Sequence, residues 1–235
     1  MGNMHAASGS VSQVQLTGEF FNKLSPAAHK DLSSMAYPLT YSAGIILFSE
    51  KDPTPGVYVV IEGEVKLSIN SSDGKRLILR IAKKGEILGL ASTLSGTASE
   101  MTAETLYPCR IAPIERREFL SFLSRNPEAY QNVTEELGRH YTKACEQLRT
   151  VGLASSAPEK LARLLLEWSQ NGQKTETGTR FVFPLTHEEI GEFIGISRET
   201  VTRTLGVFKT RHLVAFHGAT LTIPSRVALE SYARC

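Results

Sequence analysis

Hydrophobic and polar positions follow two different periods along the chain, and each period predicts a different kind of element. Two short helices are expected around the Ser25-Pro26 boundary, over residues 19–35. Over residues 39–114, short β-branched and aromatic runs alternate with Gly, Pro, Asn and Asp, as at residues 57–61, 65–69 and 76–81. Regular short strands separated by turn residues predict an antiparallel β sandwich or jelly roll.

A helical period replaces this alternation over residues 116–151. Pro127 fits the first turn of a long helix, and apolar residues then recur at spacings of three and four. They are Tyr130, Val133, Leu137, Tyr141, Ala144, Leu148 and Val151. Such a stripe packs on its own domain or pairs with a second copy, and periodicity alone slightly favours its own domain. The small residues and proline at 152–158 then mark a domain boundary.

A third helical region follows, with a helix over residues 158–169 and a polar loop over 171–179. Thr186 and Glu189 have the spacing of a capping box, which starts a helix near His187. Its apolar face consists of Ile190, Phe193 and Ile194. Gly195 fits the left-handed residue that ends a helix, and Ser197 caps the next one.

The second helix of this pair has two unlike faces. At about 100° per residue, Val201, Leu205 and Phe208 form one apolar stripe, and the opposite face carries Arg198, Glu199, Thr202 and Arg203. Arginine can donate two hydrogen bonds to guanine, and a carboxylate can accept from the cytosine amino group. Residues 213–216 and 220–223 flank a His-Gly-Ala turn and predict a wing hairpin. The pattern indicates a DNA-reading helix-turn-helix, whereas an ordinary helical hairpin with a solvated face is the alternative.

Composition narrows the class of protein. A chain of 235 residues with 41% hydrophobic and 21% charged residues is typical of a soluble globular protein of one or two domains. The net charge of +2 comes from residues 157–235, which carry ten basic and eight acidic side chains. This weak excess agrees with nucleic-acid binding without establishing it.

Cysteine usage and hydropathy predict a reduced, cytoplasmic setting without membrane association. Cys109, Cys145 and Cys235 are too few and too widely spaced for a disulfide framework or a CxxC cluster. No apolar run approaches the roughly 18 residues of a membrane span. Residues 1–13 show no signal pattern and are expected to form a disordered arm.

Two other function classes compete with DNA reading. A barrel enzyme would need a cluster of metal ligands on its strands, but residues 39–114 contain no histidine. An enzyme is therefore not expected, and neither catalytic residues nor a metal site are assigned. A signalling module would use its C-terminal helices to dock a protein, but the polar face at Arg198 and Arg203 lacks the apolar anchors of such a surface.

Three segments in this order resemble the catabolite-activator (CRP/FNR) family of bacterial transcription regulators. They are residues 57–67, residues 73–89 and residues 190–213, and the resemblance runs from about residue 20 to residue 223. It implies an α+β protein with an N-terminal antiparallel β jelly-roll sensor barrel, a long dimerisation helix and a C-terminal winged helix-turn-helix. The corresponding boundaries are a disordered arm over 1–18, the sensor over 19–126, the helix and hinge over 127–156, and the DNA-binding domain over 157–235.

The resemblance also assigns partners and residues. It implies double-stranded DNA, a second copy of the chain, RNA polymerase and an unknown small-molecule effector as partners. The family's Arg-Glu-x-x-x-Arg pattern places base contacts at Arg198, Glu199 and Arg203. The expected contacts to the DNA backbone are Thr186, His187, Ser197, Thr200, Thr202 and Lys209. The long helix is then expected to face its twin through the whole stripe from Tyr130 to Val151.

The expected effector pocket departs from the family pattern. Its residues are Gly89, Leu90, Ser99, Glu100, Tyr141 and Cys145. Leu90 stands where members that bind cyclic AMP have a ribose-binding glutamate, and residues 97–101 contain no arginine for the cyclic phosphate. Cyclic AMP is therefore not expected. An iron-sulfur cluster is not expected either, because the N-terminal part of the chain has no cysteine.

A redox or haem signal is a weaker possibility. His140 and Cys145 lie near the helix stripe, but a lone His or Cys there is more often a packed helix residue. Whether Cys145 is a redox-active thiol stays open, because reactivity depends on thiolate character.

Overall fold

The computed structural model describes residues 15–154 and 156–233. The chain forms two compact units, one of residues 1–67 and 81–140 and the other of residues 68–80 and 141–235. The predicted arm over residues 1–13 and Cys235 lie outside the described residues.

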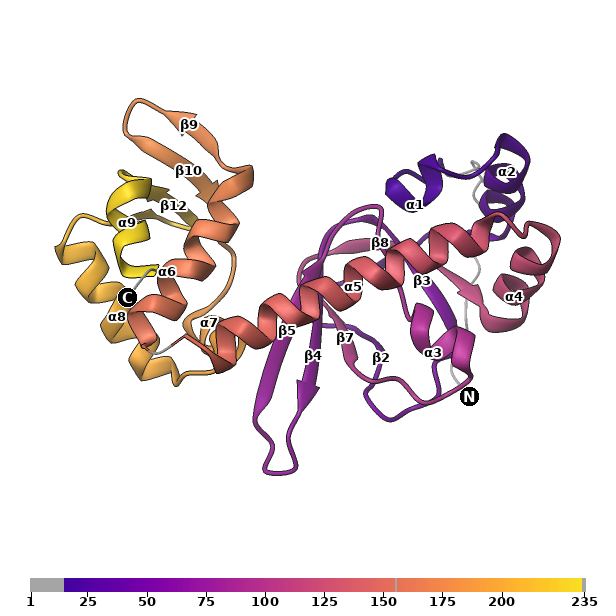
Figure 1. The fold of residues 1–235 in the computed structure, drawn as a ribbon, viewed down its shortest axis with the longest axis horizontal. Coiled ribbons are helices and arrows are strands. Elements are labelled where there is room, and N and C mark those ends of the chain that lie inside the picture. Colours follow the sequence, from indigo (N-terminus) through magenta and orange to yellow (C-terminus); the bar gives the residue numbers. More distant parts are fainter. Residues whose placement is uncertain (1–14, 155, 234–235) are drawn as a thin grey trace. The chain divides into compact units, whose positions relative to one another are not determined.

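Two four-stranded sheets confirm the predicted antiparallel jelly roll. The first has the order β1-β8-β3-β6 and the second β2-β7-β4-β5. The strands are β1 (Leu39–Tyr41), β2 (Ile46–Phe48), β3 (Gly56–Glu62), β4 (Val65–Asn70), β5 (Arg76–Ala82), β6 (Ile87–Leu88), β7 (Thr102–Thr105) and β8 (Cys109–Glu115). Strand β3 is buried from Gly56 to Ile61, because it lies between β8 and β6 in the first sheet (Figure 1).

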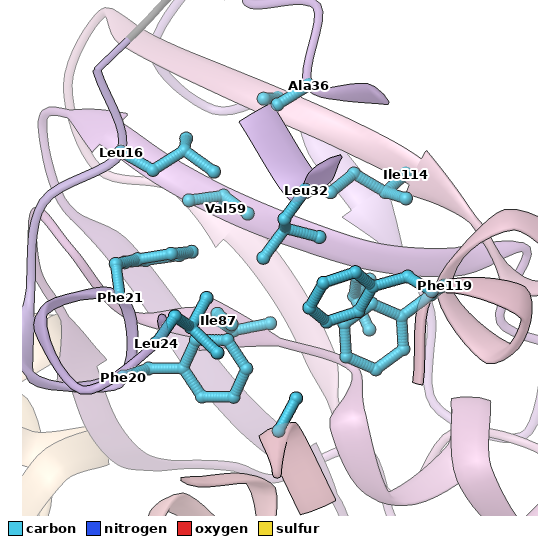
Figure 2. Close-up of a cluster of buried hydrophobic side chains, with 14 of the residues drawn as sticks. Leu16, Phe20, Phe21, Leu24, Leu32, Ala36, Val59, Ile87, Ile114 and Phe119 are labelled. Carbon is cyan, nitrogen blue, oxygen red and sulfur yellow. The ribbon is translucent and has the colours of Figure 1, made fainter. Parts of the chain in front are cut away.

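Short helices complete the core of the first unit. They are α1 (Glu19–Asn22), α2 (Pro26–Met35), α3 (Leu90–Ser95) and α4 (Arg116–Arg125). Helix α2 begins as predicted at the Ser25-Pro26 boundary, where the Ser25 hydroxyl accepts from the Ala28 amide. Figure 2 shows Phe20, Phe21 and Leu32 from the helices packed with Val59 and Ile87 from the first sheet.

The predicted disordered arm extends too far, because residues 15–18 belong to the folded unit. The Leu16 side chain is buried in the core (Figure 2). Its carbonyl oxygen lies 2.8 Å from His29 Nε2. An apolar side chain at the edge of a polar segment can be enough to anchor it.

Helix α5 (Ala129–Gly152) is the predicted long helix (Figure 1). It begins two residues later than expected, since Pro127 lies in a preceding turn, where its carbonyl accepts from Tyr130 N at 3.1 Å. The predicted stripe divides into two parts. Val133 is 3% exposed and belongs to the core of the first unit, and Leu137 packs against that core.

The assignment of Val133 to a dimer interface was therefore wrong, because its side chain already packs on its own domain. Leu137 is only partly available for the same reason. Tyr130, Tyr141 and Leu148 are exposed, and Ala144 and Val151 are half-buried. The unpaired apolar face of α5 is thus narrower than the full stripe.

The second unit contains the helix-turn-helix and a four-stranded sheet of order β11-β12-β10-β9. Its elements are α6 (Ala157–Trp168), the 3-10 helix η1 (Ser169–Asn171), β9 (Gln173–Thr175), β10 (Gly178–Val182), α7 (His187–Ile194), α8 (Arg198–Thr210), β11 (Ala215–His217), β12 (Thr220–Ile223) and α9 (Arg226–Ala233). The predicted wing is present as β11 and β12. The prediction of a polar loop over 171–179 was wrong, since β9 and β10 pair there.

Aromatic contacts hold β10 and the following chain against α6. The Trp168 and Phe183 rings meet edge to face with centroids 5.0 Å apart, and Phe181 contacts Phe183 at 6.1 Å. Such pairs add to the free energy gained by burial alone. Among the described residues, none of the helices has the length and apolar character needed to cross a membrane.

Candidate nucleic-acid interface

Helix α7 begins with the predicted capping box. The Thr186 hydroxyl accepts from Glu189 N at 3.2 Å, and Glu189 Oε2 accepts from Thr186 N at 2.9 Å. Two amides that lack partners inside the helix are thereby satisfied. The side chains of Thr186 and Glu189 therefore determine where α7 begins.

A tight turn joins α7 to α8. Gly195 ends α7 with a φ of 67°, in the left-handed region. Ile196 N donates to Gly191 O at 3.0 Å, and a Cβ added to Gly191 would lie 2.6 Å from Ile196 O. Only glycine at position 191 lets the two helices approach this closely.

Helix α8 buries its apolar stripe and exposes its polar face, as predicted. Ser197 caps it by accepting from Thr200 N at 3.3 Å. Val201, Leu205 and Phe208 are buried against the rest of the unit. Thr204 is also buried, and its hydroxyl donates to Thr200 O at 2.8 Å. The sequence analysis did not anticipate this position, because an internal hydrogen bond makes a polar side chain compatible with burial.

The three expected base-reading side chains lie together on the exposed side of α8. Arg198, Glu199 and Arg203 are all solvent-exposed. The Glu199 backbone amide and the Ser197 hydroxyl lower the pKa of the Glu199 carboxyl. The carboxylate is consequently ionised near neutral pH, the form that accepts from a cytosine amino group.

The expected backbone-contact residues surround this face, and several are already bonded to one another. His187 Nδ1 lies 2.9 Å from Thr202 Oγ1, which joins the start of α7 to the middle of α8. The Ser197 and Thr200 hydroxyls are 3.1 Å apart, and Lys209 is exposed on the last turn of α8. These bonds orient the side chains beside the exposed face of α8.

The residues expected to form an effector pocket occupy different environments. Leu90 is 1% exposed and lies in the hydrophobic core of the first unit, and its place in the pocket lining stays a prediction. Ser99 is buried, and its hydroxyl donates to Met101 O at 2.7 Å, whereas Glu100 is exposed. Gly89 has a φ of 75° and precedes α3.

Tyr141 and Cys145, the other two expected pocket residues, belong to the second unit, where Tyr141 is 73% exposed and Cys145 is half-buried. A pocket shared by all of these residues stays a prediction. Cys109 differs from Cys145, because burial raises the pKa of the Cys109 thiol. Raising that pKa disfavours the reactive thiolate.

Comparisons with known proteins match both units. The cyclic nucleotide-binding domain family matches residues 38–126, and the Crp-like helix-turn-helix domain family matches residues 159–232. The CRP-like cAMP-activated global transcriptional regulator of Mycobacterium tuberculosis is 26% identical over 225 residues, covering 95% of this chain and all of that protein.

Two further proteins have similar sequences or folds. The transcriptional activatory protein AadR of Rhodopseudomonas palustris is 29% identical over 193 residues, covering 82% of this chain and 79% of its own. The structure of the c-di-GMP-responsive global regulator CLP of Xanthomonas campestris superimposes with a TM-score of 0.74 at 19% identity, covering 86% of this chain and all of CLP. These relatives are transcription regulators and not enzymes. With its nucleotide-binding-type domain, its long helix and its Crp-like helix-turn-helix, the chain is a DNA-binding transcription regulator of the CRP/FNR family.

Proposed function

We propose that the protein acts as a homodimer that reads an inverted-repeat operator through the major groove, under the control of a small-molecule or redox signal other than cyclic AMP. The observation that supports this proposal most directly is the two-faced helix α8. Its apolar stripe is buried, and Arg198, Glu199 and Arg203 are exposed together on its other side.

Base reading follows from the chemistry of these three side chains. Each arginine fork matches the two acceptors of a guanine, and the Glu199 carboxylate matches the amino group of a neighbouring cytosine. Ser197, Thr200 and Lys209 supply hydroxyl and ammonium donors beside them for phosphate oxygens, which fix the register of the helix on the duplex.

Dimerisation would use the exposed part of the α5 stripe. Tyr130, Tyr141 and Leu148 are large apolar side chains that remain 49%, 73% and 66% exposed. Tyr141, Ala144, Leu148 and Val151 follow one another at spacings of three and four, which suit a pair of helices. Two copies related by a two-fold axis would read half-sites one helical turn, about 34 Å, apart.

A signal other than cyclic AMP is supported by the environment of Leu90. An apolar side chain in the hydrophobic core takes the position where a ribose-binding carboxylate is expected. Glu100, exposed nearby in the sequence, would repel a cyclic phosphate. Burying a phosphate without a cationic partner is costly. The Mycobacterium tuberculosis relative is cAMP-activated, so this difference calls for a direct test.

Selection of duplexes from a random pool tests the DNA-reading proposal. The full-length protein is expected to enrich inverted repeats with G·C pairs at fixed positions in each half-site. Enrichment of single, asymmetric sites or of no sequence would contradict the proposal. Repeating the selection with candidate effectors would show which of them sharpen the preference.

Calorimetry tests the effector. Titration with cyclic AMP is expected to give no binding in the micromolar range, and operator affinity is expected to stay the same in its presence. Micromolar binding together with tighter operator binding would overturn this part of the proposal. In that case Arg116 would be the first residue to substitute in a search for the cation that binds the phosphate. Its guanidinium donates to Thr93 O on α3 at 2.8 Å.

A further inference from the structure

Three side chains with metal-ligating atoms converge in the first unit. One donor atom each from Glu86, Glu136 and His140 lies within 4.8 Å of the other two. Glu136 and His140 are one helical turn apart on α5, so their side chains extend from the same face. Glu86 approaches from the turn that precedes β6.

The turn that carries Glu86 is fixed by backbone hydrogen bonds. Glu86 N donates to Lys83 O at 3.1 Å, and Glu86 Oε1 accepts from Lys83 N at 3.1 Å. Val60 on β3 holds the turn from the other side, since Val60 N donates to Glu86 O at 3.0 Å and Val60 O accepts from Gly85 N at 2.8 Å. The carboxylate therefore starts from a rigid position.

Glu136 is the buried member of the cluster, with a side chain 8% exposed. Arg139 pairs with Glu136 Oε2 and also with Glu19 at 3.0 Å. Arg139 thus orients the Glu136 carboxylate, whose other oxygen, Oε1, lies 3.0 Å from His140 Nε2.

The spacing of these atoms suits a small cation. Glu136 Oε1 and His140 Nε2 are 3.0 Å apart, close to the separation of neighbouring ligands around an ion with bonds of about 2.0–2.1 Å. One Glu86 carboxylate oxygen lies within 4.8 Å of a donor atom of each of these two residues. Mixed imidazole and carboxylate donors favour zinc, manganese or iron over magnesium, which prefers oxygen ligands and water.

We propose that Glu86, Glu136 and His140 form a binding site for a divalent first-row transition-metal ion, with Arg139 as the residue that positions Glu136. Three protein ligands leave coordination positions open for water or a small molecule. The ion would fasten α5 to the turn before β6. The site uses only residues of the first unit.

Equilibrium dialysis of the metal-free, full-length protein against Zn²⁺ tests the proposal. One tightly held ion per protomer is expected, and Glu86→Gln and His140→Ala should each weaken binding at least about tenfold, since a lost ligand costs at least as much as a lost second-shell partner. Glu86→Gln leaves the buried contacts of Glu136 in place, so this variant should fold like the wild-type protein. Weaker binding in it would then reflect the lost ligand and not a folding defect. Co²⁺ should give a visible absorption spectrum in the wild-type protein that both variants lose.

His217→Ala and Glu146→Gln are matched controls, because both side chains are exposed in the second unit. They should bind Zn²⁺ like the wild-type protein. Absence of binding in the wild-type protein would make the cluster an ion-pair network only. Unchanged binding in either Glu86→Gln or His140→Ala would also overturn the proposal. Both outcomes would leave the proposed reading of DNA unaffected.

Discussion

At the scale of single residues, the exposed face of α8 carries cations with two different proposed roles, one in contacting bases and one in contacting phosphates. Arg203 is exposed in the middle of α8, where we propose a base contact, whereas Lys209 is exposed on its last turn. A base contact carries sequence information, but a phosphate contact does not. The two cations should therefore respond differently to replacement.

Arg203→Ala should flatten the base preference at one position of each half-site. Losing one good bidentate contact costs on the order of 1–3 kcal/mol at that position. Lys209→Ala is the matched control and should weaken binding to all sequences alike. Affinities measured on a set of single-base operator variants would show the difference. Uniform weakening by Arg203→Ala would make Arg203 a phosphate contact instead.

Residue-level predictions succeeded where a local hydrogen bond or a narrow stripe decides the environment. The caps at Thr186 and Ser197 and the buried Val201 were predictable, because each depends on neighbours within one or two turns. The burial of Val133 was not predictable, because the apolar stripe of α5 includes both side chains that pack in the core and side chains that stay exposed. Thr134, the next residue, is exposed, and only the tertiary packing determines which edge of the stripe enters the core.

At the scale of elements, the turn between α7 and α8 depends on one close approach. An added Cβ at Gly191 would meet a backbone oxygen, which cannot rotate away as a side chain could. Gly206, an exposed glycine within α8, has nothing within 4 Å of the same added atom. Comparing substitutions at Gly191 and Gly206 therefore separates the cost of crowding the turn from the general cost of glycine within a helix.

Gly191→Ala should lower the free energy of unfolding by about 1–3 kcal/mol, the usual cost of overpacking. Gly206→Ala should leave it unchanged or raise it by up to about 1 kcal/mol, since alanine favours helix. Urea denaturation followed by circular dichroism would measure both. Equal effects of the two substitutions would show that the turn can relax.

Elements were predictable when their sequence showed a period. The jelly-roll strands, the long helix and both helices of the reading motif were expected on that basis, and the family matches and the fold bear them out. Strand β9 was missed because all three of its residues are exposed. A strand at the edge of a sheet with no buried face has no hydrophobic alternation to reveal it.

At the scale of the whole molecule, the exposed apolar residues of α5 support the proposed pairing with a second copy. Tyr141 and Leu148 are large, exposed and seven residues apart on one helix. Isolated apolar side chains are ordinary on a protein surface, but a repeat at coiled-coil spacing is typical of helix pairing. Two residues of the proposed metal site, Glu136 and His140, lie on α5, whereas Glu86 is fifty residues before Glu136 in the sequence, so only the fold could bring the three together.

The double variant Tyr141→Glu and Leu148→Glu should be monomeric, because four added carboxylates would meet across a two-fold interface. Leu137 is a poor choice for this test, since it packs against the core. Glu146→Lys changes charge on the same helix away from the stripe and should remain dimeric. Sedimentation velocity would distinguish the species. A wild-type dimer in the double variant would place the interface elsewhere.

The edge-to-face contact of Trp168 with Phe183 has a spectroscopic consequence. Trp168 is the only tryptophan of the chain and lies in the second unit. Its emission should report the melting of the DNA-binding part alone, whereas far-ultraviolet circular dichroism reports both units. In a thermal scan, coincident transitions would mean that the whole chain melts cooperatively. Separated transitions would give each unit its own melting temperature, obtained from the intact protein without a label.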